Sequence, residues 1–220
     1  MGEMKRSGNM SRDAVLTAAE MRKLETDAIM SGRVSGAELM ACAGERAVAE
    51  TLSLWPDLQD TISRAVILCG PGNNGGDGYV MAGILAGRGW QVDVFALGAP
   101  TRLPPDARAN RDLWAAECPV HPLADAADAM ASADLIVDAL FGIGLARPLD
   151  ADVVRVLRAV PTSTHRMSVD VPSGYDTDTG TILGDIAFPA DLTVTFHSRK
   201  PVHSVLESSG CVVRVVDIGL

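Results

Sequence analysis

Residues 70–80, GPGNNGGDGYV, combine glycines with two amides and one carboxylate. They follow an apolar run that predicts a strand, 65–69, and lead into small residues that predict a helix. Glycines between a strand and a helix commonly let backbone N–H groups hold a phosphate. Asn73, Asn74 and Asp77 add side-chain oxygens, which suit a hard cation better than a phosphate. The stretch therefore favours a site that holds an anion beside a cation.

Two common glycine motifs fit this stretch less well. Residues 70–75 satisfy G-x-G-x-x-G, but the dinucleotide fingerprint of dehydrogenases also needs an acidic residue at the end of the next strand. That strand ends in FALGAP, and its acidic residue, Asp93, stands near its start. A P-loop requires a lysine where this chain has Gly76 and Asp77, and a carboxylate there would repel a phosphate. A structural turn in which Asp77 caps the following helix remains the alternative.

Further polar side chains stand at the ends of later predicted strands. Asp138 ends LIVD, Asp170 and Ser173 lie in SVDVPSGYDTDTG, and Lys200 follows LTVTF. Singly, each has a structural alternative, as a cap, as a bond within a turn or as a solvated charge. The carboxyl ends of parallel strands meet at one edge of the sheet, where open α/β sheets bind ligands. We therefore expect these side chains and residues 70–77 to converge in one crevice.

The elements that must position these residues alternate between short apolar runs and helical patterns. Runs rich in Val, Ile and Leu predict strands at 65–69, 92–97, 135–141, 167–171, 192–196 and 211–218. Helical periodicity predicts helices at about 76–88, 106–117, 123–131 and 150–159, after two leading helices that run from Asp13 to Ile29 and from Ala37 to Leu54. This alternation indicates a largely parallel sheet covered on both faces. The predicted fold is an α/β, three-layer αβα, Rossmann-like domain with two leading N-terminal helices.

Length and composition fit one domain. The chain has 220 residues, 47% of them hydrophobic, and a net charge of -9. We expect a disordered tail at 1–11 and one domain at 12–220. The acidic balance disfavours nucleic-acid binding, which needs a basic face. No apolar run reaches the roughly 18 residues of a membrane span.

The cysteines predict a reducing compartment. Cys42, Cys69, Cys118 and Cys211 are scattered without C-x-x-C spacing, so we expect free thiols. The start of the chain has no hydrophobic region of the kind that a secretory signal needs. Together these features predict a cytoplasmic protein.

Several segments in order carry a resemblance to a known family. GPGNNGGDG, VDALFGIGLARPL, SVDVPSGYDTDTG and TVTFHSRK, with the leading AAEMRKLETDAI and ELMACAG, resemble the YjeF N-terminal domain of the NAD(P)H-hydrate epimerase family. The similarity runs from about residue 13 to 220. The chain departs from the family at Ala41 and Cys42, where LMENAG is usual, and in the residues on either side of Lys200 in HSRKPV.

The resemblance implies a reaction, a substrate and an ion. The family interconverts the R and S forms of hydrated NADH and NADPH (NADHX and NADPHX) at C6 of the nicotinamide ring, and a partner dehydratase accepts the S form. The resemblance implies one K⁺ ion per subunit, held by Asn74, Asp138 and Ser173, and a phosphate contact from Arg147. The implied substrate-binding residues are Asn73, Asn74, Gly75, Gly76, Asp77, Gly142, Ile143, Gly144, Leu145, Ala146, Arg147, Pro148 and Asp170.

Asp170 is the predicted catalytic acid/base, with Lys200 as the alternative. Inversion at C6 requires the hydroxyl to leave as water and water to return from the other face of the ring. A carboxyl group can donate the first proton and accept the second if burial raises its pKa toward neutrality. Asp170 stands at a strand end, whereas helix capping would occupy Asp77 and the cation would occupy Asp138.

Other function classes remain as alternatives. YjeF-type domains also occur as non-catalytic nucleotide-binding or protein-interaction modules, among them an mRNA-decapping scaffold and an apolipoprotein-binding protein. A scaffold has no need of Asn74, Asp138 and Asp170, all of which this chain has. A hydrolase would need a nucleophile, and no G-x-S-x-G elbow is present. The sequence leaves open a homodimer, the choice between NADHX and NADPHX, and whether the chain is a stand-alone epimerase or half of a bifunctional protein.

Overall fold

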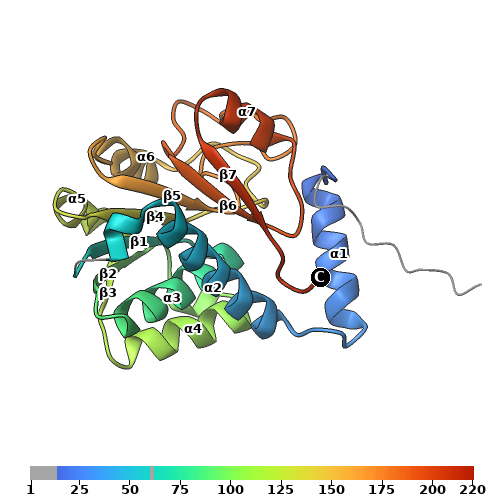
Figure 1. The fold of residues 1–220 in the computed structure, drawn as a ribbon, viewed down its shortest axis with the longest axis horizontal. Helices are drawn as coiled ribbons and strands as arrows, with labels where there is room; N and C mark the ends of the chain where they lie inside the picture. The colour runs from blue at the N-terminus through green and yellow to red at the C-terminus, as the bar shows by residue number, and fades with distance from the viewer. Residues whose placement is uncertain (1–13, 60–61) are drawn as a thin grey trace, which may run out of the picture.

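One parallel sheet lies between layers of helices (Figure 1). The computed structural model describes residues 14–59 and 62–220. Within them, seven strands lie in the order β3-β2-β1-β4-β5-β6-β7, and every neighbouring pair is parallel. The predicted αβα, Rossmann-like fold is confirmed, whereas the predicted tail at 1–11 lies outside the described residues.

The elements follow each other along the chain with short connections. The strands are β1 (Arg64–Cys69), β2 (Gln91–Ala96), β3 (Val120–Pro122), β4 (Leu135–Ala139), β5 (His165–Val169), β6 (Leu192–Phe196) and β7 (Val212–Val216). The helices are α1 (Ala18–Met30), α2 (Gly36–Leu54), α3 (Asn73–Gly87), α4 (Pro105–Ala115), α5 (Ala126–Met130), α6 (Ala151–Arg158) and α7 (Val202–Ser208). Short 3-10 turns lie at Pro56–Gln59, Pro100–Arg102 and Leu123–Asp125.

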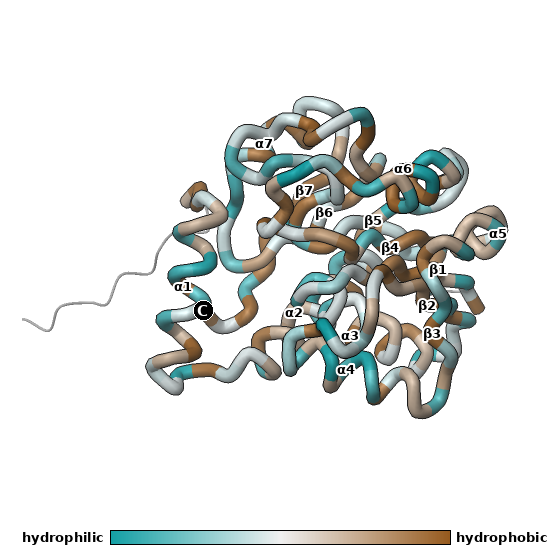
Figure 2. Tube along the Cα trace, turned by 180° about the vertical axis from the view of Figure 1, so that it is seen from behind, coloured by the Kyte–Doolittle hydropathy of each residue, from teal (hydrophilic) through white to brown (hydrophobic). Residues whose placement is uncertain are grey.

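Alternate side chains of β1 enter two separate hydrophobic clusters. Ala65, Ile67 and Cys69 pack in the cluster that includes α2, α3 and α4. Val66 and Leu68 pack in the cluster that includes α5 and α6. A strand buried on both faces needs a continuous apolar run, which is why residues 65–69 show no polar alternation. Figure 2 shows hydrophobic residues along β1 and the neighbouring β4.

Two boundaries and one helix cap near the strand ends differ from the predicted ones. α3 begins at Asn73, so the NNGGD residues form the first turn of a helix and not a loop. Its N-cap is Gly72, and Asp77 lies buried inside the helix, so the predicted capping by Asp77 is wrong. Asn and Gly have low helix propensity, which hides this turn from a sequence pattern. β5 ends at Val169, because Asp170 takes a left-handed φ of 66°.

Two elements lie where the sequence predicts none. β3 is a three-residue strand at the edge of the sheet, and α7 is a helix of seven residues. Both are too short to show a hydrophobic period. Pairing with β2 and packing beside β7 stabilise them instead.

α1 stands apart from the helices that cover the sheet, beyond the ends of β6 and β7 (Figure 1). The Asp178 carboxylate accepts a hydrogen bond from the Ala18 N–H in its first turn, at 2.7 Å. Just before the helix, the Leu16 N–H donates to the Arg199 carbonyl at 2.8 Å. Because Arg199 precedes Lys200, these bonds tie the start of α1 to the loop that follows β6.

A capping box sets the first residue of α1. The Thr17 hydroxyl accepts from the Glu20 N–H at 3.3 Å, and the Glu20 carboxylate accepts from the Thr17 N–H at 2.9 Å. Val15, which the apolar period places inside the helix, instead pairs with Arg199 as an isolated β-bridge. The predicted helix therefore starts too early, because the cap overrides the period.

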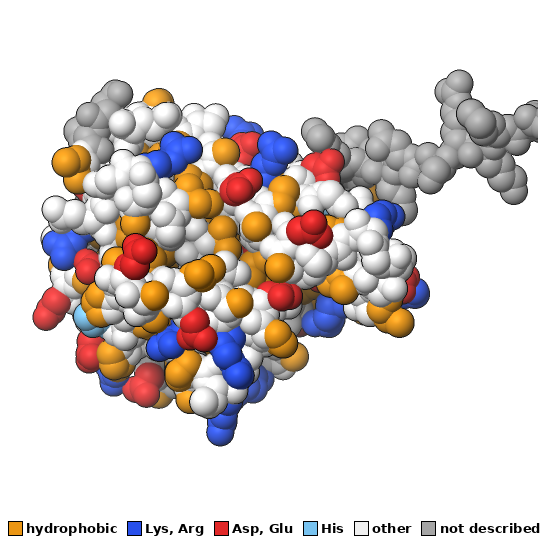
Figure 3. Space-filling view, turned by 90° about the horizontal axis from the view of Figure 1, so that it is seen from below, with side chains coloured by type: hydrophobic (Ala, Val, Ile, Leu, Met, Phe, Trp, Pro, Cys, Tyr) orange, Lys and Arg blue, Asp and Glu red, His pale blue; other side chains and the backbone are white. Residues whose placement is uncertain are grey.

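The surface over α3 and α4 carries charges of both signs. Figure 3 shows acidic and basic side chains interspersed on this face, with hydrophobic side chains between them. In the part of the chain that the structure describes, no helix combines the length and apolar character needed to cross a membrane. All four cysteines are free thiols.

Candidate functional site

A cavity of about 380 Å³ lies beyond the carboxyl ends of the central strands. It is at the point where the chain order in the sheet reverses, between β1 and β4, and open α/β sheets bind ligands there. Its walls are Arg22, Glu25, Pro71, Gly72, Asn73, Asn74, Asp77, Leu140, Phe141, Gly142, Ile143, Gly144, Asp170 and Phe196. The structure thus gathers residues from the first, fourth and fifth strand ends in one crevice, together with two residues of α1.

Lys200 forms a buried ion pair with Asp170. Its Nζ lies 2.7 Å from Oδ1 of Asp170, and it also donates to the Thr195 hydroxyl at 2.7 Å and to the Phe196 carbonyl at 3.1 Å. Lys200 is only 1% exposed. Its ammonium group therefore has a protein acceptor for each of its three hydrogens.

The other carboxylate oxygen of Asp170 faces the cavity. Lys200 and Thr195 both donate to Oδ1, and no described residue donates to Oδ2. Oδ2 lies 3.1 Å from the position that a Cβ on Gly142 would take. A side chain at residue 142 would therefore crowd the oxygen that is open to a ligand.

Asp170 is ionised in this setting. Burial by itself raises its pKa, but the charge of Lys200 and the hydrogen bonds from Lys200 and Thr195 outweigh burial and hold the pKa below the ordinary value. The predicted acid/base role of Asp170 assumed that burial raises its pKa toward neutrality, and this assumption is wrong. The ion pair with Lys200, which exists only in the folded chain, lowers the pKa of Asp170 instead of letting it rise.

Two further carboxyl groups share the cavity with Asp170. Burial and then the Asp170 charge raise the pKa of Glu25 to about 7, although Lys200 and Arg22 lower it. Burial, the Asp170 charge and Glu25 raise the pKa of Asp77 well above its ordinary value. The cavity therefore holds one ionised carboxylate beside two carboxyl groups that are pushed toward the protonated form.

Asp138 and Ser173 form a second buried pair, behind the cavity wall. Ser173 donates to Asp138 from its N–H and from its hydroxyl, both at 2.7 Å, and the Leu140 N–H donates at 3.1 Å. Burial raises the pKa of Asp138 to about 6, although these hydrogen bonds lower it. The structure brings these two predicted residues together, but neither lines the cavity.

Asn74 is the predicted cation ligand that reaches the cavity. Its Nδ2 atom is buried and has no hydrogen-bond partner among the described residues. A flip of the amide would place an oxygen at that position. Amide, carboxylate and hydroxyl oxygens of Asn74, Asp138 and Ser173 are the donors that hard cations take, so this residue set fits a K⁺ ion. Across residues 14–59 and 62–220, no cluster of three or more His, Cys, Asp and Glu residues is arranged to hold a metal ion.

Gly75 and Gly76 lie behind the cavity and not in its wall. A Cβ on Gly75 would come within 2.1 Å of the Gly70 carbonyl oxygen, and one on Gly76 within 2.5 Å of the Met40 sulfur. Gly75 therefore needs to be glycine so that α3 can pack against the turn after β1, whereas at Gly76 the flexible end of Met40 would have to move.

The second predicted substrate segment, 142–148, enters the cavity only at its start. Residues 142–144 line the cavity, and residues 145–148 do not. The side chain of Arg147 is 72% exposed and forms an ion pair with Asp150 at 3.1 Å. The structure thus leaves Arg147 outside the cavity wall.

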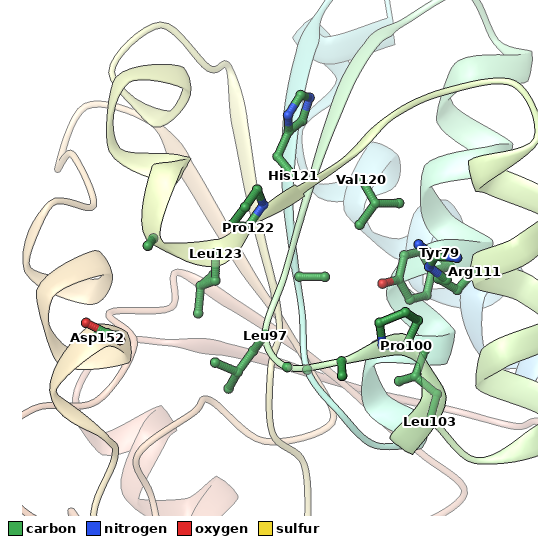
Figure 4. Close-up of a pocket in the computed structure, with 15 residues that line it drawn as sticks. Tyr79, Leu97, Pro100, Leu103, Arg111, Val120, His121, Pro122, Leu123 and Asp152 are labelled. Atoms are coloured by element: carbon green, nitrogen blue, oxygen red, sulfur yellow. The ribbon is translucent and has the colours of Figure 1, made fainter.

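A second cavity, of about 360 Å³, lies beyond the ends of β1, β2 and β3 (Figure 4). Tyr79 and Arg111 lie together on one side of it, and Asp152 lies on the opposite side. None of the predicted catalytic, substrate-binding or metal-binding residues lines it. Those predicted site residues that line either cavity therefore all line the first one.

Comparison with known proteins identifies the family. A family model described as YjeF-related protein N-terminus matches residues 36–202. The chain belongs to this family. Over 210 residues it is 46% identical to an NAD(P)H-hydrate epimerase of Rhodobacter capsulatus, covering 94% of this chain and 99% of that protein. It is 44% identical to an NAD(P)H-hydrate epimerase of Cereibacter sphaeroides, covering 91% and 99% of the two chains.

Two further matches are a longer bifunctional protein and a solved structure. A bifunctional NAD(P)H-hydrate repair enzyme of Coxiella burnetii is 36% identical, over 82% of this chain but only 36% of that protein. The crystal structure of the yeast protein ynu0 has the same fold, with a TM-score of 0.77 at 21% identity over 93% of this chain and 87% of that chain.

The residues at which this chain departs from the usual YjeF motifs do not line the cavity. Ala41 and Cys42 of α2 do not line it. The Cys42 sulfur lies 3.9 Å from the Asp217 carbonyl oxygen. Lys200 contacts Asp170 even though the residues around it differ from the usual pattern.

Arg22 and Glu25 are the charged cavity residues that were not predicted from the sequence. Arg22 donates from its guanidinium group to the Ile143 carbonyl at 3.3 Å. Glu25 follows Met21 by four residues and precedes Ala28 by three, and both of those neighbours are at most 2% exposed. A carboxylate on the buried face of an amphipathic helix is the signal that would have found Glu25.

Proposed function

We propose that this chain is an NAD(P)H-hydrate epimerase, which interconverts the R and S forms of NADHX and NADPHX at C6 of the nicotinamide ring. The observation that carries the proposal is the 46% identity to the Rhodobacter capsulatus NAD(P)H-hydrate epimerase over 94% of this chain and 99% of that protein. The cavity supports it, because proton-transferring groups lie where a Rossmann-like sheet binds its ligand.

Asp170 is the proposed catalytic residue. When the C6 hydroxyl leaves as water, the ring nitrogen stabilises the cation that remains, and a water molecule then adds to the other face. The open Oδ2 of Asp170 offers a negative charge to that cation and accepts the proton of the incoming water. Lys200 keeps this carboxylate ionised and oriented. A proton-transfer role for Lys200 itself is the alternative, and its fully bonded ammonium group disfavours it.

Some of the proposed substrate-binding residues line the cavity and the others lie outside its wall. Asn73, Asn74, Asp77 and residues 142–144 line the cavity and would receive the nicotinamide end of the dinucleotide. Gly75 and Gly76 shape the wall from behind, and residues 145–148 continue the loop away from it. Arg147 would reach a phosphate group by exchanging its Asp150 partner for the ligand.

We propose one K⁺ ion per subunit at Asn74, Asp138 and Ser173. A bound ion there would supply a fixed positive charge beside the cavity, which favours anionic groups of the dinucleotide. We expect K⁺ to raise the melting temperature of the wild-type protein more than choline at equal ionic strength, because a ligand of the folded state stabilises it. Asn74→Ala should lose this difference, whereas Asn73→Ala, a neighbouring cavity residue, should keep it. Equal shifts in both variants would remove Asn74 from the ion site.

We place the reaction in the cytoplasm, coupled to an NAD(P)H-hydrate dehydratase that consumes the S form. The R form would then be drawn through this enzyme as the S form is removed. Light scattering of the purified protein would separate a monomer from the homodimer that the sequence leaves open.

The experiment follows the R and S forms of NADHX by chromatography, with and without purified protein. The mixture is first depleted of the S form by an S-specific dehydratase, and the return of the S form is then timed. We expect the protein to accelerate this return above the spontaneous rate. Binding of NADHX without acceleration would instead identify a non-catalytic nucleotide-binding module.

A further inference from the structure

We infer that Glu25 is a second catalytic residue, the carboxylic acid that exchanges a proton with the C6 hydroxyl while Asp170 serves the incoming water. This inference rests on the proposed epimerase function. It gives the cavity two proton-transferring groups on different elements, one on α1 and one directly after β5.

The structure places Glu25 by fixing α1 at two points. The Asp178 carboxylate accepts from the Ala18 N–H at the start of the helix, at 2.7 Å. One turn further on, the Arg22 guanidinium donates to the Ile143 carbonyl at 3.3 Å, which holds the helix against the loop after β4. Glu25 follows Arg22 by three residues, and its side chain enters the cavity wall.

Glu25 lacks the contacts of a structural carboxylate. It is partly buried on the face of α1 that also carries Met21 and Ala28. No described residue donates a hydrogen bond to its carboxyl group or forms an ion pair with it, whereas Glu20 of the same helix caps Thr17 and Asp27 pairs with Lys23. A partly buried carboxyl group without a partner costs stability, and a role at the cavity explains why the site holds one.

The inferred mechanism uses two proton sites in opposite states. The C6–O bond breaks with its electron pair on oxygen, the Glu25 carboxyl gives that oxygen a proton, and water leaves. The nitrogen lone pair completes a C=N bond. A second water then forms a C6–O bond on the other face and gives a proton to Asp170. One proton has moved from Glu25 to Asp170. Proton exchange with solvent resets both groups before the next turnover in the same direction, and no oxidant or reductant takes part.

The surroundings of the two carboxyl groups favour Asp170 as the base and Glu25 as the acid. Lys200 and Thr195 hold Asp170 in its ionised form, whereas burial and the Asp170 charge raise the pKa of Glu25 to about 7. Pairs of titratable groups whose environments separate their pKa values are the usual acid and base of a site. Asp77 is the competing acid, because it lines the same cavity from within α3, and the experiment therefore includes it.

The experiment compares Glu25→Gln with Asp77→Asn and with a control, Asp27→Asn, which changes an exposed carboxylate two residues further along α1. We expect Glu25→Gln to fold, since no hydrogen bond is lost, and to lower kcat by about 10²–10⁴-fold with little change in KM. The wild-type kcat/KM, which reports the ionisations of the free enzyme, should fall above about pH 7 as Glu25 ionises, and Glu25→Gln should lack this falling limb. Formate should restore part of the activity of Glu25→Ala.

The outcomes separate the inference from the proposed function. An active wild-type enzyme with a near wild-type Glu25→Gln variant overturns the role of Glu25 alone. Loss of the falling limb in Asp77→Asn, with the limb kept in Glu25→Gln, assigns the acid to Asp77 and also overturns it. A wild-type protein that does not accelerate epimerisation overturns both proposals. Formate rescue of Glu25→Ala supports proton transfer even if the glutamine variant misfolds.

Discussion

The three carboxyl groups in the cavity have different charge states because their neighbours differ. Asp170 has an ammonium group at 2.7 Å and a hydroxyl at 2.8 Å, and both favour its charge. Asp77 is of the same type, yet burial and the Asp170 charge oppose its ionisation. Because one negative charge already occupies the cavity, each further ionisation there is costly. Substitutions at Asp170 therefore change both the proposed chemistry and the charge balance of the cavity.

Asp170→Asn should lower kcat by about 10²–10⁴-fold, the usual value of a positioned proton-transfer group. It also leaves the Lys200 ammonium buried without a counter-charge, and breaking a buried pair on one side costs roughly 3–5 kcal/mol of stability. The double variant Asp170→Asn/Lys200→Met removes both charges and should recover stability but not activity. Thermal unfolding and epimerisation assays on the same samples check both parts. Near wild-type turnover by Asp170→Asn with an inactive Lys200→Met would transfer the role to the lysine.

Arg147→Ala should raise KM by roughly 10–100-fold while leaving kcat nearly unchanged. A charge-assisted bond to a phosphate is worth about 1.5–3 kcal/mol and is made equally in the ground and transition states. Arg155→Ala is the matched control, because Arg155 is also exposed and pairs with Asp152 at 3.2 Å. Steady-state kinetics with NADHX decide the matter. A collapse of kcat at constant KM would contradict a phosphate-binding role.

Among the elements, α1 has the most unusual position. It packs beyond the strand ends rather than on a face of the sheet, so it closes the cavity with Arg22 and Glu25 (Figure 1). Its attachment depends on a few bonds to the segments that follow β5 and β6, including the one from Ala18 to Asp178. An element with few anchoring contacts opens more readily than the core, so α1 is the part of the site most sensitive to changes at its anchors.

Asp178→Ala should loosen α1 and lower kcat through the misplacement of Glu25. The change removes an acceptor for the Ala18 N–H and a negative charge beside the helix N-terminus, together worth about 1 kcal/mol. Hydrogen exchange of the α1 amides should accelerate, while that of β1 should stay unchanged. Asp185→Ala, at an exposed position later in the same connection, is the control and should leave α1 as it is. Unchanged α1 exchange in Asp178→Ala would show that this anchor is dispensable.

At the scale of the whole molecule, ionisable groups gather at the ends of the central strands, whose interiors are mainly apolar. The strands β1 and β4 are almost entirely buried, and Asp138 is the only charged residue within β4. Carboxyl groups at the strand ends therefore titrate in an environment with little water. Their shifts make the stability of the folded chain depend on pH.

The Glu25 carboxyl should make the protein less stable as pH rises toward neutrality. Its pKa rises from 4.5 to about 7 on folding, so the folded state favours the protonated form. This contribution is fully present below about pH 4.5 and is lost as pH rises through about 7, to a total of at most about 3 kcal/mol. Glu25→Gln should remove this part of the pH dependence, and Asp27→Asn should not. Urea unfolding at pH 4.5, 6 and 8 measures it, and parallel curves for wild type and Glu25→Gln would contradict the shift.

The layered fold and half of the residues in the cavity wall could be predicted from the sequence. Its apolar runs reflect burial on both sheet faces, as at 65–69, and parallel strand ends must meet at one edge, which brings Asn74 and Asp170 together. The charge states of the cavity carboxyl groups could not be predicted, because they depend on contacts between distant segments. Lys200 reaches Asp170 across thirty positions of sequence, and α1 brings Glu25 to the cavity from the other end of the chain. Local patterns record periodicity and caps, whereas burial and the distance between charges exist only after distant segments have packed.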